Sequence, residues 1–272
     1  AGEFIDGKAS GKTLLAQMEA TGKLVQDKHQ VKRLAQDYLA DPAAEKDKLV
    51  VVHTHADAAA VNAQIRAGLK GKSLDESQAA TIETRNREGD RRQSEICVGE
   101  RIRFTKNGGP DGPPVFNNDL GEVVGIGRKA ILDKDGKDTG KTSTMLRVRM
   151  EADAAGKQRE VEIDTHAYQR IDYAYARTVH SAQGLGVDSV FYLGRGGGNV
   201  DRNAGMVAMT RAKQNFRMYV SPAERQKIEA SLDEWGDKQT AREMASKRLA
   251  LEQKAPDLKQ EAAAAVSEIA NQ

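Results

Sequence analysis

Cysteine, aromatic residues and long apolar runs are all scarce in this 272-residue sequence, and each scarcity excludes a class of protein. The one cysteine, Cys97, cannot form an internal disulfide, and a cysteine-based zinc site needs several such ligands. No apolar stretch approaches the about 20 residues of a membrane-spanning helix, and no signal-peptide segment is found near the start. We therefore expect a soluble, cytoplasmic protein.

A strong excess of either charge is also missing. Lys and Arg total 42 against 40 for Asp and Glu, so the net charge of +2 indicates no partner by itself. Aromatic residues make up only 4 %, yet runs of Leu, Val and Ile recur, which argues against disorder. The length suffices for one large domain or two smaller ones with buried cores.

Both halves of the chain contain segments typical of an α/β domain. Apolar residues at helical spacing predict helix from about 13 to 39, and the continuous run Leu49–Val52 predicts a strand buried on both faces. An amphipathic helix follows that strand and ends near Gly71. The same pattern returns with a strand at Ser189–Leu193, a helix at Met206–Lys213 and a strand at Phe216–Val220.

The middle of the chain has a different pattern. Residues 73–95 are polar, which indicates a loop or a solvated strand. Short alternating segments separated by Gly, Asn and Asp turns then predict a small antiparallel barrel or sheet inserted into the α/β domain. Its expected strands are Ile96–Phe104, Gly121–Ile126, Met145–Met150 and Glu160–Ile163.

Several segments imitate functional motifs but lack a necessary part. Asp6–Thr13 is one residue short of a phosphate-binding P-loop and has no preceding strand, so we interpret it as a helix start. Gly125–Ala130 mimics a dinucleotide fingerprint, but no helix follows, and we interpret it as a turn. Asp75-Glu76 imitates a Walker B pair, and we expect a solvated loop there. The spacing of His53, His55, His166 and His180 matches no metal signature, and no triad can be assigned to them.

Two segments carry a stronger signal. Tyr175–Asp188 contains a Thr/His/Gln/Gly turn before a buried strand, where hydroxyl, amide and backbone groups can hold phosphates. Val207–Lys213 contains Arg211 in a predicted helix near a sheet edge, where an arginine can stabilise a γ-phosphate contributed by a neighbouring domain. Either segment alone fits an ordinary junction between a helix and a strand, but their order and separation point to one class of enzyme.

These segments resemble motifs V and VI of superfamily 1 helicases, usually written T-x-H-K-[SA]-Q-G and V-A-[LM]-T-R-A. Upstream, Leu49–Leu69 is similar to the start of the second RecA-like domain, and Ile96–Phe104 with Asn117–Val123 is similar to the start of a RecD-type 2B insertion. The stretch with Leu34, Tyr38 and Leu39 resembles conjugative relaxase–helicases of the TraI/TraA type. The resemblance covers about residues 20 to 222.

The resemblance implies an α/β fold: a partial RecA-like parallel sheet with helices, interrupted by a small β-rich (2B, SH3/barrel-like) subdomain and helical at both ends. The expected domains are a helical segment at 1–47, a discontinuous RecA-like 2A domain at 48–96 and 169–221, a 2B-like insertion at 97–168, and a charged helical tail at 222–272.

Two departures from the family bear on function. The first RecA-like domain, with its phosphate and magnesium ligands, is absent from this sequence, and Ser181 stands where motif V has lysine. The resemblance therefore favours a non-catalytic domain of a conjugative relaxase that binds single-stranded DNA and acts as a translocation signal for a type IV secretion system, whose coupling protein is the expected partner beside the other domains of the polypeptide. The alternative is the second half of an active ATP-dependent 5′-to-3′ helicase, and a third class, a free-standing β-barrel adaptor, fits motifs V and VI poorly.

The resemblance also assigns candidate residues. The basic side chains among the partner-binding candidates would suit an acidic face of a coupling ATPase. Arg211 as an arginine finger and Gln183 would be catalytic only in an active parent module, which alone would need ATP and magnesium; this chain is expected to need no cofactor or metal. The candidates for binding nucleic acid are Thr178, His180, Gln183, Arg101, Arg103 and Lys106, and those for binding the partner are Arg128, Lys129, Arg147 and Arg149.

Overall fold

The computed structural model describes residues 10–85, 89–110, 112–152, 156–182, 186–196, 200 and 202–233. The chain divides into two compact units, Ala1–Glu234 and Trp235–Gln272, and all described residues belong to the first. Within those residues no helix is long and apolar enough to cross a membrane.

A five-stranded sheet in which all neighbouring strands are parallel forms the α/β part, in the order β1-β12-β11-β2-β10. Val190 of β11 pairs with Leu49 of β2, so the two buried runs lie in one sheet, as predicted. The strands are β1 (Leu24–Gln26), β2 (Lys48–Val52), β10 (Ala176–Thr178), β11 (Val187–Gly194) and β12 (Ala212–Val220).

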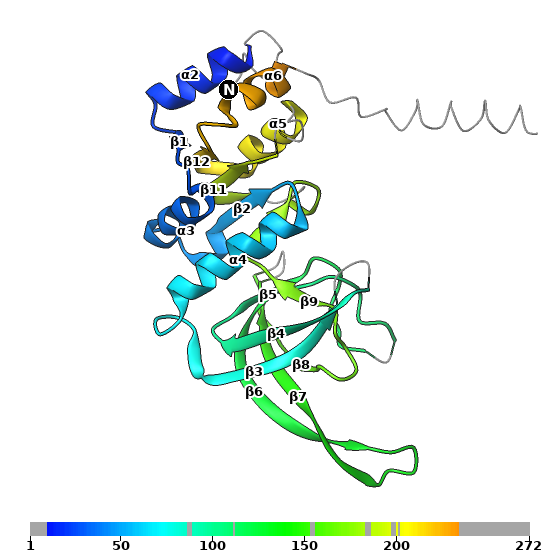
Figure 1. Ribbon diagram of the computed structural model, residues 1–272. Helices are drawn as coiled ribbons and strands as arrows, with labels where there is room; N and C mark the ends of the chain where they lie inside the picture. Colours follow the sequence, from blue (N-terminus) through cyan, green and yellow to red (C-terminus); the bar gives the residue numbers. More distant parts are fainter. Residues whose placement is uncertain are drawn as a thin grey trace, which may run out of the picture. The chain divides into compact units, whose positions relative to one another are not determined.

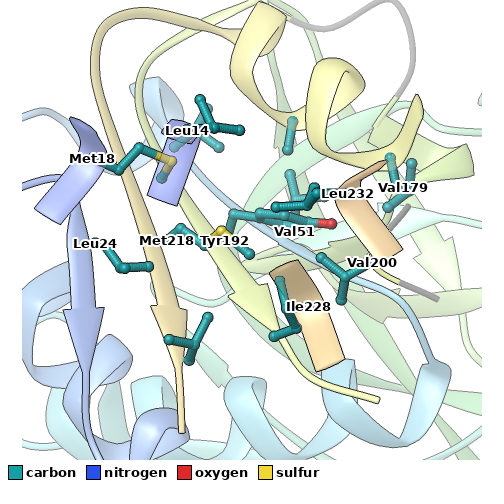
Figure 2. Packing of buried hydrophobic residues seen from close by; sticks show 14 of the residues in the cluster. Leu14, Met18, Leu24, Val51, Val179, Tyr192, Val200, Met218, Ile228 and Leu232 are labelled. Atoms are coloured by element: carbon teal, nitrogen blue, oxygen red, sulfur yellow. The ribbon is translucent and has the colours of Figure 1, made fainter. Parts of the chain in front are cut away.

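Helices cover both faces of this sheet, which is why every residue of β2 is buried (Figure 1). Val50 and Val52 pack among residues of α3 and α4, whereas Leu49 and Val51 face the core shared by α2, α5 and α6. Figure 2 shows this second core, with Leu14 and Ile228 among its members. The helices are α2 (Gly11–Ala20), α3 (Gln30–Ala40), α4 (His55–Leu69), α5 (Arg202–Arg211) and α6 (Arg225–Asp233), with short 3-10 turns η1 (Glu45–Asp47) and η2 (His180–Ala182).

The β-rich part contains a two-stranded hairpin and a five-stranded antiparallel sheet in the order β8-β7-β6-β5-β9. A third apolar core joins them, because Ile82 and Ile96 of the hairpin pack with Phe104 and Val148 of the sheet. The strands are β3 (Asp75–Arg85), β4 (Arg91–Val98), β5 (Arg101–Phe104), β6 (Leu120–Leu132), β7 (Asp138–Met150), β8 (Glu160–Asp164) and β9 (Ile171–Tyr173).

The predicted fold class is confirmed: a parallel α/β sheet is interrupted by a β-rich insertion. The insertion is wider than the expected 97–168, since its packed strands run from Asp75 to Tyr173. Most of residues 73–95 lie in the paired strands β3 and β4. The first half of β3 has no buried side chain, so the polar composition concealed a strand pair. Gly99, at φ +89°, turns the chain from β4 into β5 within the expected strand Ile96–Phe104.

Two further predictions need correction. The expected continuous helix from 13 to 39 is interrupted by β1, because Gly22 at φ +67° ends α2 and Leu24 then joins β12. The glycine pair Gly125–Gly127 lies inside β6 and is not a turn, since Gly125 pairs with Arg147 and Gly127 with Met145. As Figure 1 shows, β6 and β7 continue as a two-stranded ribbon beyond the strands that flank them.

The described end of the P-loop-like segment is a helix start packed on α6. Ser10 caps α2 by accepting a hydrogen bond from the Thr13 backbone N–H, and the Gly11 N–H donates to Asp233 Oδ1 at 2.6 Å. The Gly11 N–H is therefore already bonded to a carboxylate. Asp6, and the tail from residue 234 onward, lie outside the described residues.

Candidate nucleic-acid interface

A cleft of about 460 Å³ lies between the parallel sheet and the β-rich insertion. One wall consists of residues that follow the carboxyl ends of β2 and β10, and the other comes from β5, β9 and the loop before β6. In open α/β sheets this edge is where ligands bind. The lining residues are His53, Thr54, His55, Arg103, Thr105, Asn117, Asn118, Asp172, Thr178, His180 and Ser181.

The β2 side of the cleft is ordered by the start of α4. Thr54 caps this helix, because its hydroxyl accepts from the Asp57 backbone N–H at 3.0 Å. His53 Nε2 lies 2.7 Å from the Tyr192 hydroxyl oxygen on the neighbouring strand β11. The amino end of a 15-residue helix therefore faces the cleft, where its backbone N–H groups favour an anion.

The β10 side is built by the short turn η2. The Ser181 hydroxyl donates to the Thr178 carbonyl at 3.0 Å and lies 3.1 Å from the Thr178 hydroxyl. This local network holds Ser181 against the backbone, whereas His180 is exposed. The residue that replaces the family's lysine thus shapes the turn and contributes no charge to the cleft.

Positive charge reaches the cleft from the insertion. Arg103 donates to Asp172 at 3.3 Å, and Arg92 donates to the other oxygen of the same carboxylate at 2.5 Å. One carboxylate is thus shared by two guanidinium groups, which leaves a local excess of positive charge. The Arg103 Nε–H is buried and has no hydrogen-bond partner among the described residues.

A backbone feature marks the same wall. Asn118, at φ +74°, is the one non-glycine residue with positive φ in the described part of the chain. Its side-chain oxygen accepts a hydrogen bond of 3.4 Å from Arg103. Asparagine tolerates the left-handed region better than most residues, and such conformations are common at binding sites.

The structure brings some of the predicted nucleic-acid residues together and separates others. Thr178, His180 and Arg103 line the one cleft. Arg101 instead pairs with Glu151 and lines a different pocket, and Lys106 lies in a third hollow beside Arg170. Gln183 lies outside the described residues. The roles of all these residues stay predictions.

The four predicted partner-binding residues lie on the β6–β7 pair. Arg128 and Lys129 are exposed and form no ion pair with any residue that the structure describes. Arg147 and Arg149 lie 3.7 and 3.6 Å from the Glu160 carboxylate on β8. The two pairs therefore differ: the second is partly neutralised by its neighbouring strand.

The remaining catalytic candidate, Arg211, ends α5. Its guanidinium donates to the Val207 carbonyl and to the Thr210 hydroxyl, and it does not line the cleft. Across the described ranges no three His, Cys, Asp or Glu side chains gather closely enough to hold a metal ion.

Sequence reasoning missed His53, Thr54 and His55 as members of the cleft. The signal was available, because these residues directly follow the buried run Leu49–Val52, and the carboxyl end of a parallel strand is where sites form. Asp172 gave no comparable signal, since only the folded chain brings it to Arg103 and Arg92.

An open parallel sheet with a partly basic cleft at the carboxyl ends of β2 and β10, and a β-rich insertion between those strands, defines an α/β domain with a ligand-binding edge.

No protein-family model matches the chain. It is 26 % identical over 219 residues to a probable conjugal transfer protein TraA of Sinorhizobium fredii, covering 80 % of this chain and 17 % of that protein. It is 28 % identical over 189 residues to the conjugal transfer protein TraA of Rhizobium radiobacter, covering 70 % and 15 %. The expected relationship to conjugal transfer proteins is confirmed, and the chain spans about a sixth of these relatives' length.

Solved structures with a similar arrangement include Pif1 helicases. The Candida albicans enzyme matches with a TM-score of 0.43 and 16 % identity, over 73 % of this chain and 53 % of that one. Unliganded Pif1 from Bacteroides sp. matches with a TM-score of 0.37 and 16 % identity, over 84 % and 51 %. This chain spans about half the length of each.

Proposed function

We propose that this chain is a non-catalytic, helicase-like domain of a conjugal transfer relaxase, and that it binds single-stranded DNA in the cleft at the carboxyl ends of β2 and β10. The observation that carries the proposal is that Thr178 and His180 line one cleft together with Arg103, which comes from a distant segment of the sequence. Hydroxyl, imidazole and guanidinium donors beside the amino end of α4 suit a phosphodiester backbone.

An exposed aromatic residue supports the single-stranded form of the ligand. Phe116 is 63 % exposed and directly precedes Asn117 and Asn118 of the cleft wall. Unpaired bases stack on such side chains with little sequence preference, which contributes about 1–3 kcal/mol per base. A duplex offers no free base faces, so the proposal predicts a preference for single strands.

Fluorescence anisotropy with a labelled oligothymidylate, measured from low to moderate salt, tests the cleft. We expect weak, salt-sensitive binding, which His180→Ala and Phe116→Ala weaken without altering the circular dichroism spectrum. Arg103→Met should flatten the salt slope by about 0.7, because one phosphate of the single strand would no longer be neutralised. Lys32→Met is the matched control, since Lys32 is exposed on α3 and lies outside the cleft.

Two outcomes would overturn the DNA-binding proposal. The first is binding that stays undetectable even at low salt. The second is an equal loss of affinity in Lys32→Met and in Arg103→Met, which would move the DNA-binding surface away from the cleft.

We further propose that the β6–β7 ribbon carries a recognition signal for a type IV secretion coupling protein, so that the chain is cytoplasmic until it is exported. Support comes from Arg128 and Lys129, exposed cations on a two-stranded ribbon whose strands are 13 residues each. A loop-like projection can change without disturbing the core. Basic groups there would recognise an acidic partner surface mainly through the association rate.

A transfer assay with this chain fused to a reporter protein tests the signal. Charge reversal at Arg128 and Lys129 should reduce secretion while leaving the melting temperature nearly unchanged, whereas reversal at Lys23, exposed beyond the end of α2, should have no effect. Normal transfer by the ribbon variant would place the signal elsewhere. The proposal assigns no cofactor to this chain; ATP and magnesium would belong only to an active parent helicase.

A further inference from the structure

A second pocket, of about 300 Å³, lies at the opposite, amino-terminal side of the parallel strands. Its lining combines the starts of β2 and β11 with residues of β5, β10 and the end of β7, and it shares no residue with the cleft. The charged lining residues are Lys46, Asp47, Lys48, Arg101, Glu151 and Arg177.

Arg177 is the unusual member of this group. Its register partner on β2 is Val51, so it sits at the edge of a sheet face that is otherwise apolar. The side chain is only 2 % exposed, and the one hydrogen bond that it forms among the described residues is a 3.5 Å contact from Nη1 to the Ser181 carbonyl. Nη2 is buried without a partner, and no carboxylate in the described part of the chain lies within ion-pair distance.

The other buried cations around the pocket are already matched. Lys48 Nζ lies 2.7 Å from Glu45 and donates to the Tyr38 carbonyl at 3.2 Å. Arg101 contacts the Glu151 carboxylate and the Glu45 carbonyl. Neither carboxylate forms an ion pair with Arg177, whose charge Glu151 and Asp172 offset only in part and from a greater distance.

The pKa of Arg177 reflects the same local excess of positive charge. Burial, followed by the neighbouring guanidinium groups of Arg103 and Arg101, lowers the pKa of Arg177 to about 9. The guanidinium is still charged at neutral pH, so the fold holds an unmatched buried cation, which normally costs several kcal/mol.

We propose that this pocket binds a phosphate group and that Arg177 is its principal ligand. A buried guanidinium whose Nη2 has no hydrogen-bond partner among the described residues offers donors that phosphate oxygens accept. Arg101 and Lys48 add positive potential at the rim, while Glu151 is neutralised by Arg101. The volume accommodates a phosphate ion or a nucleoside monophosphate. This pocket shares no lining residue with the proposed DNA cleft, although Arg177 donates a hydrogen bond to the carbonyl of the cleft residue Ser181.

Thermal unfolding in a phosphate-free buffer, titrated with inorganic phosphate at constant ionic strength kept with chloride, tests the pocket. We expect a saturable rise in Tm, by about 5–10 °C at a hundredfold excess over Kd. Arg177→Met should abolish the rise while matching or exceeding the wild-type Tm without phosphate, because it removes an unmatched charge. Arg33→Met, at an exposed arginine paired with Asp37, should leave the rise intact.

Comparing the Tm of the wild type and of Arg177→Met, with and without phosphate, separates a ligand site from a structural role. If Arg177 serves only the fold, Arg177→Met lowers Tm equally with and without phosphate, and the proposal is wrong. It is also wrong if phosphate shifts Tm no more than chloride does. His180→Ala must retain the full phosphate response, since its loss would place the phosphate in the cleft.

The source of the phosphate group is resolved by further probes in the same assay. Stabilisation by inorganic phosphate and a nucleoside monophosphate, but not by an oligonucleotide, identifies a small-molecule site. Stabilisation by an oligonucleotide that Arg177→Met removes identifies the nucleic-acid backbone as the ligand. Either result supports the pocket, and a lack of response to all of them refutes it.

Discussion

The ion pair between Glu100 and Arg66 links the insertion to the α/β part, and breaking it should destabilise the whole described unit. Glu100 is 0 % exposed, and its two oxygens accept hydrogen bonds from Arg66 Nε and from the Tyr175 hydroxyl, both at 2.9 Å. Burial raises the pKa of Glu100, and the Arg66 guanidinium offsets this only in part. Glu100→Met would leave Arg66 buried without its closest carboxylate.

The expected cost can be worked from these contacts. Removing one partner of a buried pair costs about 3–5 kcal/mol, and the lower end applies because Arg66 Nη2 keeps the Glu95 carbonyl at 2.8 Å. A loss of about 3 kcal/mol lowers Tm by about 6–12 °C in a unit of this size. Arg66→Met should cost a similar amount, while the double variant should recover most of the loss because no unmatched charge remains.

Urea denaturation followed by circular dichroism gives the free energy of unfolding of the wild type, both single variants and the double variant. Glu83→Met, which removes a more exposed pairing with Arg91, is the control and should cost no more than about 1 kcal/mol. The reasoning fails if the double variant loses as much stability as the sum of the two single variants, because the two charges would then not be coupled.

Three single features give further predictions. The purified chain should not hydrolyse ATP even with single-stranded DNA, since its segment Asp6–Thr13 is one residue short of a phosphate-binding P-loop; stimulated phosphate release would contradict this. Gly99→Ala should destabilise by more than about 1 kcal/mol in urea, because φ is +89° and an added Cβ would lie 2.0 Å from the Ser73 carbonyl oxygen. Burial would raise the pKa of Glu224, but bonds from the Gly196 N–H, Ser221 and Gln30 prevail and lower it. Its contribution is therefore fully present above its unfolded pKa of about 4.5 and is lost as the pH falls through the lowered pKa of the folded state, so Glu224→Gln should reduce stability at pH 7 and make progressively less difference as the pH falls through that lowered pKa.

Hydrophobic pattern alone determined the strands β2, β11 and β12 of the central sheet. Leu49–Val52 and Ser189–Leu193 are apolar at every position or nearly so, and such runs need cover on both faces. The insertion was foreseeable for the same reason, since alternation with regular turns specifies antiparallel strands. The bounds of the insertion could not be predicted from the sequence. The strands β3 and β4 bury few side chains, and those they bury pack against the core that includes Phe104.

The tertiary structure decided which basic side chains line the cleft. Arg101 and Arg103 lie two residues apart on one strand, so period-two alternation places them on the same face and cannot separate them. Their long side chains diverge because their carboxylate partners come from distant segments, Glu151 for the first and Asp172 for the second. Arg177 stands beside a motif residue in the sequence, and only packing against the sheet edge reveals it as a buried, unmatched charge. The local sequence pattern indicates which secondary structure a segment favours and which face it buries. The environment of a charged side chain depends on groups that the chain brings together only when it folds.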